Sequence, residues 1–159
     1  MQHYHLAQIN IAHAHAEMDT ATMRGFVERL DEINAIADSF SGFVWRLQSE
    51  NGGDATAIRP FTDPLMLVNM SVWEDLESLK QYVYKSLHVE LIRDRDAWFA
   101  KMLDAHQALW WIPAGHIPTV AEGKEKLAYL QEHGVSRAAF TFAKPFLPTA
   151  EEKLFKDDK

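Results

Sequence analysis

The sequence predicts an α+β fold whose elements follow the order β-α-β-β-α-β, and three patterns lead to that prediction. Residues 65–73 (LMLVNMSVW) are a nearly continuous apolar run, which is typical of a central strand covered on both faces. Residues 3–12 (HYHLAQINIA) alternate and are rich in strand-forming residues. Residues 23–40 repeat apolar side chains at helical spacing. The order is that of the ferredoxin-like arrangement, in which helices cover one face of an antiparallel sheet.

The composition of the 159-residue chain fits a single globular domain. The formal net charge is -7 and the basic residues are scattered, which argues against nucleic-acid binding. There is no cysteine, which excludes disulfides and a thiolate nucleophile. No apolar run approaches the roughly 20 residues of a membrane helix. Residues 1–17 lack the pattern of a signal peptide, so we expect a cytoplasmic protein without a membrane partner.

The elements between the first helix and the central strand follow from turn residues. The helix over residues 23–40 ends in the segment 39–42 (SFSG), and residues 42–48 (GFVWRLQ) are predicted as the second strand. The segment 51–54 (NGGD) has the chemistry of a turn, with a short edge strand expected over residues 56–59.

The second half of the chain supplies a second helix, a fourth strand and an added helix. Asp75 is predicted as the N-cap of a helical segment that runs to residue 99, either kinked or bent. Residues 107–112 (QALWWI) are predicted as the fourth strand. Thr119 and Glu122 form a T-x-x-E capping box for a last helix that Gly134 ends. A short fifth strand over 139–142 and a charged tail over 149–159 complete the prediction of one domain, residues 1–148.

The expected strands offer apolar residues on both faces, and one layer of helices cannot bury both. We therefore expect a second copy of the chain to cover the face without helices. The prediction is a homodimer built as a dimeric α/β barrel.

Several sequence segments are more specific than a general fold pattern requires. They occur in the order that a known family shows, over roughly residues 3–146. Together they resemble the domain of unknown function 3291 family, within the dimeric α/β-barrel superfamily. The resemblance implies a ferredoxin-like unit that pairs into a barrel. It also implies kinship with cofactor-free monooxygenases that oxidise polyketide quinols, with haem-degrading and haem-binding enzymes, and with small-molecule isomerases. The strings are HLAQINIA at 5–12, LDEINAIAD at 30–38, GFVWRLQ at 42–48, LVNMSVWE at 67–74, RDAWF at 95–99 with Tyr84 and His88 before it, LWWIPAGHIPT at 109–119 and AFTF at 139–142 followed by Phe146.

His88 and Arg95 are the candidate catalytic residues. They are seven positions apart, so on a helix they share one face, with Tyr84 and Trp98 flanking that face. A histidine beside an arginine and aromatic walls can act as a general base, an anion clamp or a haem ligand. The alternative is a structural network in which Arg95 pairs with a nearby carboxylate such as Asp94.

The string LWWIPAGHIPT supplies two further ligand-binding candidates, Trp111 and His116. Trp110 and Trp111 should point to opposite faces of the sheet, and Gly115 permits a tight turn that places His116 beside a helix N-terminus. The alternative is a rigid corner with both tryptophans in the core.

Asn10, Arg46 and Asn69 are polar residues within otherwise apolar strands. A buried polar side chain needs partners, so each indicates a hydrogen-bonded network or a ligand contact. His13 and His15 form an H-x-H pair, but no third ligand completes it, so no metal site is predicted.

Three functions remain open at this stage. The first is a cofactor-independent monooxygenase in which His88 takes a proton from an aromatic or polyene substrate and Arg95 stabilises the anion. The second is a haem-binding protein or haem-dependent oxidoreductase with His88 or His116 as axial ligand. The third is a non-catalytic dimeric module that binds a small apolar or aromatic molecule. The cofactor is accordingly none or haem.

Overall fold

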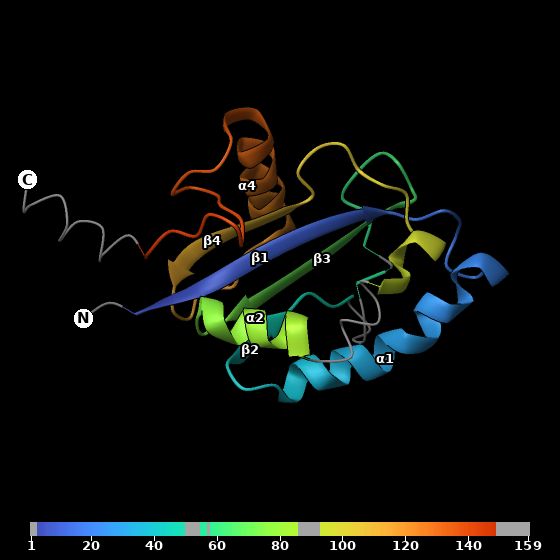
Figure 1. The fold of residues 1–159 in the computed structure, drawn as a ribbon, viewed down its shortest axis with the longest axis horizontal. Coiled ribbons are helices and arrows are strands. Elements are labelled where there is room, and N and C mark those ends of the chain that lie inside the picture. The colour runs from blue at the N-terminus through green and yellow to red at the C-terminus, as the bar shows by residue number, and fades with distance from the viewer. Residues whose placement is uncertain (1–2, 50–54, 57, 86–92, 149–159) are drawn as a thin grey trace, which may run out of the picture.

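The computed structural model describes residues 3–49, 55–56, 58–85 and 93–148, and its centre is a four-stranded antiparallel sheet (Figure 1). The strand order is β2-β3-β1-β4, which is the order of the ferredoxin-like fold. The α+β fold class and the central position of the third strand are therefore confirmed. The strands are β1 (Tyr4–His13), β2 (Phe43–Arg46), β3 (Met66–Trp73) and β4 (Gln107–Pro113).

Two helices cover one face of this sheet, as predicted (Figure 1). Helix α1 (Arg24–Ser39) follows a short 3-10 turn, and α2 (Leu76–Lys85) follows β3 directly. Asp75 caps α2, since its Oδ1 accepts the backbone N–H of Ser78 at 2.7 Å. A buried cluster joins the two helices to the sheet: Leu6, Ile33, Ala37, Trp73, Leu79, Tyr82, Leu109 and Phe140.

The opposite face of the sheet is covered by the added C-terminal helix, α4 (Val120–His133) (Figure 1). Leu127 and Leu130 of α4 join a cluster with the buried side chains of that face, among them Ile9 and Met70. Gly123 permits the close approach, because a Cβ there would lie 2.9 Å from Ile9 Cδ1 and 3.0 Å from Met70 Cε. The premise that a second subunit must cover this face is therefore wrong, and the homodimer stays a prediction without that support.

The predicted capping box of α4 is confirmed for its threonine, but its glutamate has other partners than predicted. Thr119 Oγ1 accepts the backbone N–H of Glu122 at 3.1 Å. The Glu122 carboxylate does not return to the cap, because it accepts hydrogen bonds from Trp110 and His116. Gly134 ends the helix with a φ of 77°, a conformation that favours glycine.

Three predicted segments differ in detail. The predicted fifth strand takes the form of isolated bridges: Phe140 exchanges both backbone hydrogen bonds with Leu109, and Thr141 bridges to Lys144. Residues 58–59 of the expected edge strand are not in a strand. Of the expected long helical segment, the described residues form α2 up to Lys85, and residues 93–94 are α-helical and lead into a short 3-10 helix, Arg95–Ala97. Residues 86–92 and the tail 149–159 lie outside the described residues. No helix in the described part of the chain is long and apolar enough to cross a membrane.

Candidate functional site

A belt of polar side chains crosses the middle of the sheet surface that faces α1 and α2. On one side of it lies the cluster around Leu6 and Trp73, and on the other a smaller cluster around Ala14 and Leu67. Strand pairing builds the belt, because Asn10 is opposite Asn69 in β3 and side chains two positions apart share a face. The polar belt consists of Gln8, Asn10, Asn69, Ser71 and Gln107.

Gln8 is the centre of the polar belt. Its Nε2 donates to Asn69 Oδ1 and to Ser71 Oγ, each at 2.8 Å. Its Oε1 accepts from Asn10 Nδ2 at 3.2 Å and from Gln107 Nε2 at 3.5 Å. Both donors and both acceptor positions of the amide are in use, which explains how a glutamine that is 3% exposed is tolerated in the sheet.

The polar belt is buried at Gln8 and open at Asn69. Asn69 is exposed although it lies in the middle of a central strand whose other residues are buried or half-buried. Asn10 and Gln107 are half-buried. Since backbone pairing and Gln8 hold these side chains in place, the belt presents fixed hydrogen-bonding groups to whatever contacts this surface.

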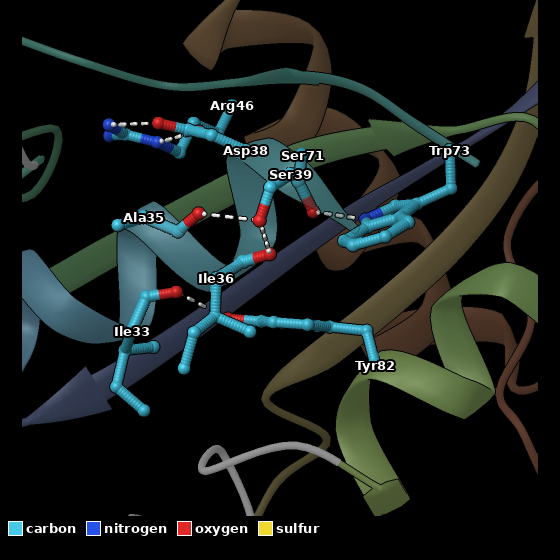
Figure 2. Close-up of polar contacts among 9 residues, drawn as sticks. All are labelled: Ile33, Ala35, Ile36, Asp38, Ser39, Arg46, Ser71, Trp73 and Tyr82. Carbon is cyan, nitrogen blue, oxygen red and sulfur yellow. Dashed lines mark hydrogen bonds and ion pairs between the residues drawn. The ribbon is translucent and has the colours of Figure 1, made fainter. Parts of the chain in front are cut away.

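An aromatic wall adjoins the polar belt at Ser71. The indole N–H of Trp73 donates to Ser71 Oγ at 2.9 Å, and the Trp73 ring stacks on Tyr82 with centroids 5.0 Å apart (Figure 2). Trp73 is 1% exposed, and the rings of Phe40 and Phe43 pack edge-on against it. The wall is a rigid element of the core that fixes the position of the Ser71 hydroxyl.

Arg46 lies beside this wall and is held by a carboxylate of α1. Its Nε donates to Asp38 Oδ1 at 2.7 Å and its Nη2 to Asp38 Oδ2 at 3.2 Å (Figure 2). This bidentate pairing neutralises much of the Arg46 charge. Burial raises the pKa of the Tyr82 phenol from 10.0 to about 12, while Arg46 lowers it and Asp38 raises it.

The raised pKa of Tyr82 predicts a loss of stability in alkali. The folded protein holds the phenolic proton more tightly than the unfolded chain does. Its contribution to the free energy of unfolding is therefore complete below pH 10 and is lost as pH rises toward about 12. The loss approaches ~3 kcal/mol at its limit. Denaturant unfolding at pH 9 and pH 11 should show a larger decline for the wild-type protein than for Tyr82→Phe, and equal declines would contradict this.

The predicted constellation around Arg95 is only partly brought together. Arg95 is exposed, and its backbone carbonyl accepts the N–H groups of Trp98 and Phe99. Trp98 is 6% exposed and packs in the cluster with Met23 and Leu67. Its indole therefore belongs to the core, and His88, the other candidate catalytic residue, lies outside the described residues.

The carboxylate expected to pair with Arg95 has other partners. Asp94 accepts hydrogen bonds from Arg29 at 3.2 Å and from Arg93. The Arg93 hydrogen bond is the main cause of the lowered pKa of Asp94. Tyr84 is 62% exposed on α2 and its ring contacts Phe142. Tyr84 thus lies apart from the polar belt.

The two adjacent tryptophans point to opposite faces, as predicted. Trp110 lies in the cluster beneath α4, whereas Trp111 contacts Phe140 on the other face and donates its indole N–H to the Phe146 carbonyl at 2.7 Å. His116 Nε2 lies 2.7 Å from Glu122 Oε1 at the start of α4. Trp111 and His116 therefore each have a protein partner, and their roles as ligand-binding residues stay predictions, as does the haem hypothesis that rests on His88 and His116.

His13 and His15 contact separate partners at the end of β1. His13 Nε2 lies 2.8 Å from Asp63 Oδ2, and His15 Nε2 lies 3.0 Å from the Asp96 carbonyl. The backbone N–H of Leu65 lowers the pKa of Asp63, and His13 adds to this effect. Within the described residues no three His, Asp or Glu side chains are placed to hold a metal ion.

A family model described as Domain of unknown function (DUF3291) matches residues 5–156 of the chain. The chain belongs to this family. No curated protein matches the sequence.

Solved structures of similar shape cover most of their own length but share little sequence with this family member. A protein of unknown function from Nitrosomonas europaea, NE2512, is 10% identical with a TM-score of 0.46, covering 73% of this chain and 96% of its own. SnoaB, a cofactor-independent oxygenase from Streptomyces nogalater, is 14% identical with a TM-score of 0.45, covering 73% and 96%. A DABB family protein with a ferredoxin-like fold from Mesorhizobium loti is 14% identical with a TM-score of 0.42, covering 73% and 98%.

Sequence reasoning singled out Asn10 and Asn69 but missed Gln8, Ser71 and Gln107. The signal was present for two of these: Gln8 has the parity of Asn10 in β1, and Ser71 has the parity of Asn69 in β3. Two polar pairs on two strands indicate a shared network once the strands are known to be neighbours. Gln107 carried no such signal, because it is the first residue of its strand.

Proposed function

We propose that this DUF3291 family member is a small-molecule enzyme that binds a planar aromatic substrate over the polar belt and promotes its oxidation by O2 without a cofactor. The site is argued from the structure, and the reaction class from the resemblance of the sequence to the dimeric α/β-barrel superfamily. A non-catalytic binding module is the alternative that the test below separates from it.

The observation that carries the proposal is the exposed Asn69 at the centre of a buried strand. An apolar side chain here would extend the clusters on either side, so the exposed Asn69 amide interrupts an otherwise apolar surface. Its carboxamide is held by Gln8, so an oxyanion placed over it meets a donor that needs no reorganisation.

The proposed chemistry begins with loss of a proton from an acidic C–H or phenolic O–H of the substrate. The resulting anion delocalises its charge onto an oxygen, which the Asn69 N–H stabilises, and the electron-rich carbon then reacts with O2. For a ring CH2 group the balance is CH2 + O2 giving C=O + H2O. The described part of the polar belt contains neutral groups alone, so we assign the proton acceptor to His88 and a supporting positive charge to Arg95 as proposals.

Oxygen uptake with 2-hydroxyanthrone tests the proposal. An electrode records O2 consumption while absorbance follows the anthraquinone product, and the rate is compared with the spontaneous rate at the same pH. We expect an enzyme-dependent rate with one O2 consumed for each anthraquinone formed. If the protein binds the anthrone but does not accelerate its oxidation, the enzyme hypothesis is overturned and the non-catalytic binding module remains.

The homodimer is part of the proposal and has its own measurement. Light scattering coupled to size-exclusion chromatography gives the mass in solution, to be compared with 18.2 kDa for one chain. A mass of twice that value would support the homodimer, and a monomer at all concentrations would overturn it.

A further inference from the structure

The hydrogen bonds of Gln8 determine which atoms of the polar belt remain for a ligand. Asn69 uses its Oδ1 to accept from Gln8, so its Nδ2 is left to donate outward. Asn10 uses its Nδ2 to donate to Gln8, so its Oδ1 is left to accept. Within the described residues neither of these remaining atoms has a hydrogen-bond partner.

The Ser71 side chain, which is 7% exposed, helps to hold the Gln8 amide in this orientation. Its oxygen accepts from both Gln8 Nε2 and the Trp73 indole, and the indole N–H can only donate. Both acceptor positions of the oxygen are then in use, which leaves its proton without an acceptor in the part of the chain that the structure describes. The β3 side of the belt therefore presents the exposed Asn69 donor, and the β1 side presents the Asn10 acceptor.

We infer that the polar belt takes an aromatic ligand that carries a carbonyl or oxyanion oxygen over Asn69 and a hydroxyl over Asn10, and that Gln8 is the positioning residue that imposes this pattern. The inference rests on the proposed function and deepens it by naming the substrate class. An aromatic hydroxyketone supplies the matching pattern, because its carbonyl accepts while its hydroxyl donates.

Strand geometry sets the spacing of the two ligand oxygens. Asn10 and Asn69 are directly opposite each other in the β1–β3 pairing. Side chains opposite each other on antiparallel strands have Cβ atoms roughly 4.5–5.5 Å apart. Oxygen substituents in a meta relationship on one aromatic edge span a similar distance. A hydroxyl adjacent to a carbonyl instead forms an intramolecular hydrogen bond with it. The preferred ligand therefore carries its carbonyl and hydroxyl meta to each other.

Three probes with one bicyclic skeleton test the pattern. 7-Hydroxy-1-tetralone carries both groups, 1-tetralone lacks the hydroxyl, and 5,6,7,8-tetrahydro-2-naphthol lacks the carbonyl. Dissociation constants come from NMR titration of the side-chain amide signals of Asn10 and Asn69. We expect 7-hydroxy-1-tetralone to bind about fivefold to tenfold more tightly than either relative, since each missing hydrogen bond is worth about 1 kcal/mol.

The Gln8→Glu variant separates positioning from simple support of the fold. A carboxylate can only accept, so it turns the Asn69 amide and leaves the Asn69 oxygen facing outward. We expect the advantage of 7-hydroxy-1-tetralone over tetrahydro-2-naphthol to disappear while 1-tetralone loses affinity too. A structural role alone would weaken all three probes equally. Where Gln8→Glu does not fold, Asn69→Asp at the exposed position tests the same loss of the carbonyl advantage.

Each remaining result is decisive. Equal affinities of the three probes for the wild-type protein, with shifts at Asn10 and Asn69, would overturn the hydroxyketone class and leave the belt as a binding site. A carbonyl advantage that persists in a folded Gln8→Glu variant would overturn the role of Gln8. If none of the three probes binds, the inferred ligand pattern of the polar belt is overturned. The oxygen-uptake assay then tests the proposed function separately.

Discussion

Replacing Asn69 with alanine is expected to lower the oxidation rate about 100-fold, the cost of removing one preorganised oxyanion donor. The side chain lies exposed on a central strand and, among the residues that the structure describes, makes one hydrogen bond, to Gln8. Because it is exposed, its truncation leaves no cavity, and the protein should remain folded. The check is kcat for anthrone oxidation, with the fold confirmed by circular dichroism and thermal unfolding.

The matched control for this variant is Gln81→Ala. Gln81 also donates a side-chain amide to a protein oxygen, Glu77 Oε1 at 2.9 Å, but it lies on α2 away from the polar belt. We expect its oxidation rate to equal that of the wild-type protein. If Asn69→Ala and Gln81→Ala oxidise the anthrone equally fast, the reacting atoms do not lie over Asn69.

The second large effect concerns α4 and the face of the sheet that it covers. Gly123→Leu should lower the free energy of unfolding by about 3 kcal/mol, at the upper end for overpacking of a close-packed core. A Cβ at position 123 already meets Ile9 Cδ1 at 2.9 Å and Met70 Sδ at 3.0 Å, so a leucine must push these buried side chains aside or shift the helix. Urea unfolding followed by tryptophan fluorescence measures the change.

Ala128→Leu introduces the same side chain on the exposed side of α4 and serves as the control. We expect its unfolding free energy to stay within about 0.5 kcal/mol of the wild-type value. If Gly123→Leu is as stable as Ala128→Leu, then α4 does not pack on the sheet, and the argument that a second subunit covers that face regains its force.

The elements of the fold could be predicted where one local pattern decides them. The apolar run of 65–73, the cap at Asp75 and the threonine of the α4 cap all occur as expected, because each depends on residues close in sequence. The side of the sheet taken by α4 could not be predicted. That choice depends on the fit of Gly123 against Ile9 and on the burial of Leu127, which are contacts between distant segments.

The candidate site was predictable in part for the same reason. Asn10 and Asn69 were conspicuous as polar residues in apolar strands, but their common partner, Gln8, is identified only by the register that places Gln8 opposite Ser71. Trp98 was expected at a ligand and belongs to the core, because a buried aromatic side chain has the same local pattern in both settings.

The most direct test of the polar belt as the ligand site is a crystal structure of the protein with 2-hydroxyanthraquinone, the product of the proposed reaction. We predict that the ring system lies on the sheet surface between α1 and β3, with one quinone or phenol oxygen within hydrogen-bond distance of Asn69 Nδ2. A product molecule bound elsewhere, with the Asn69 side chain contacting only water, would contradict it.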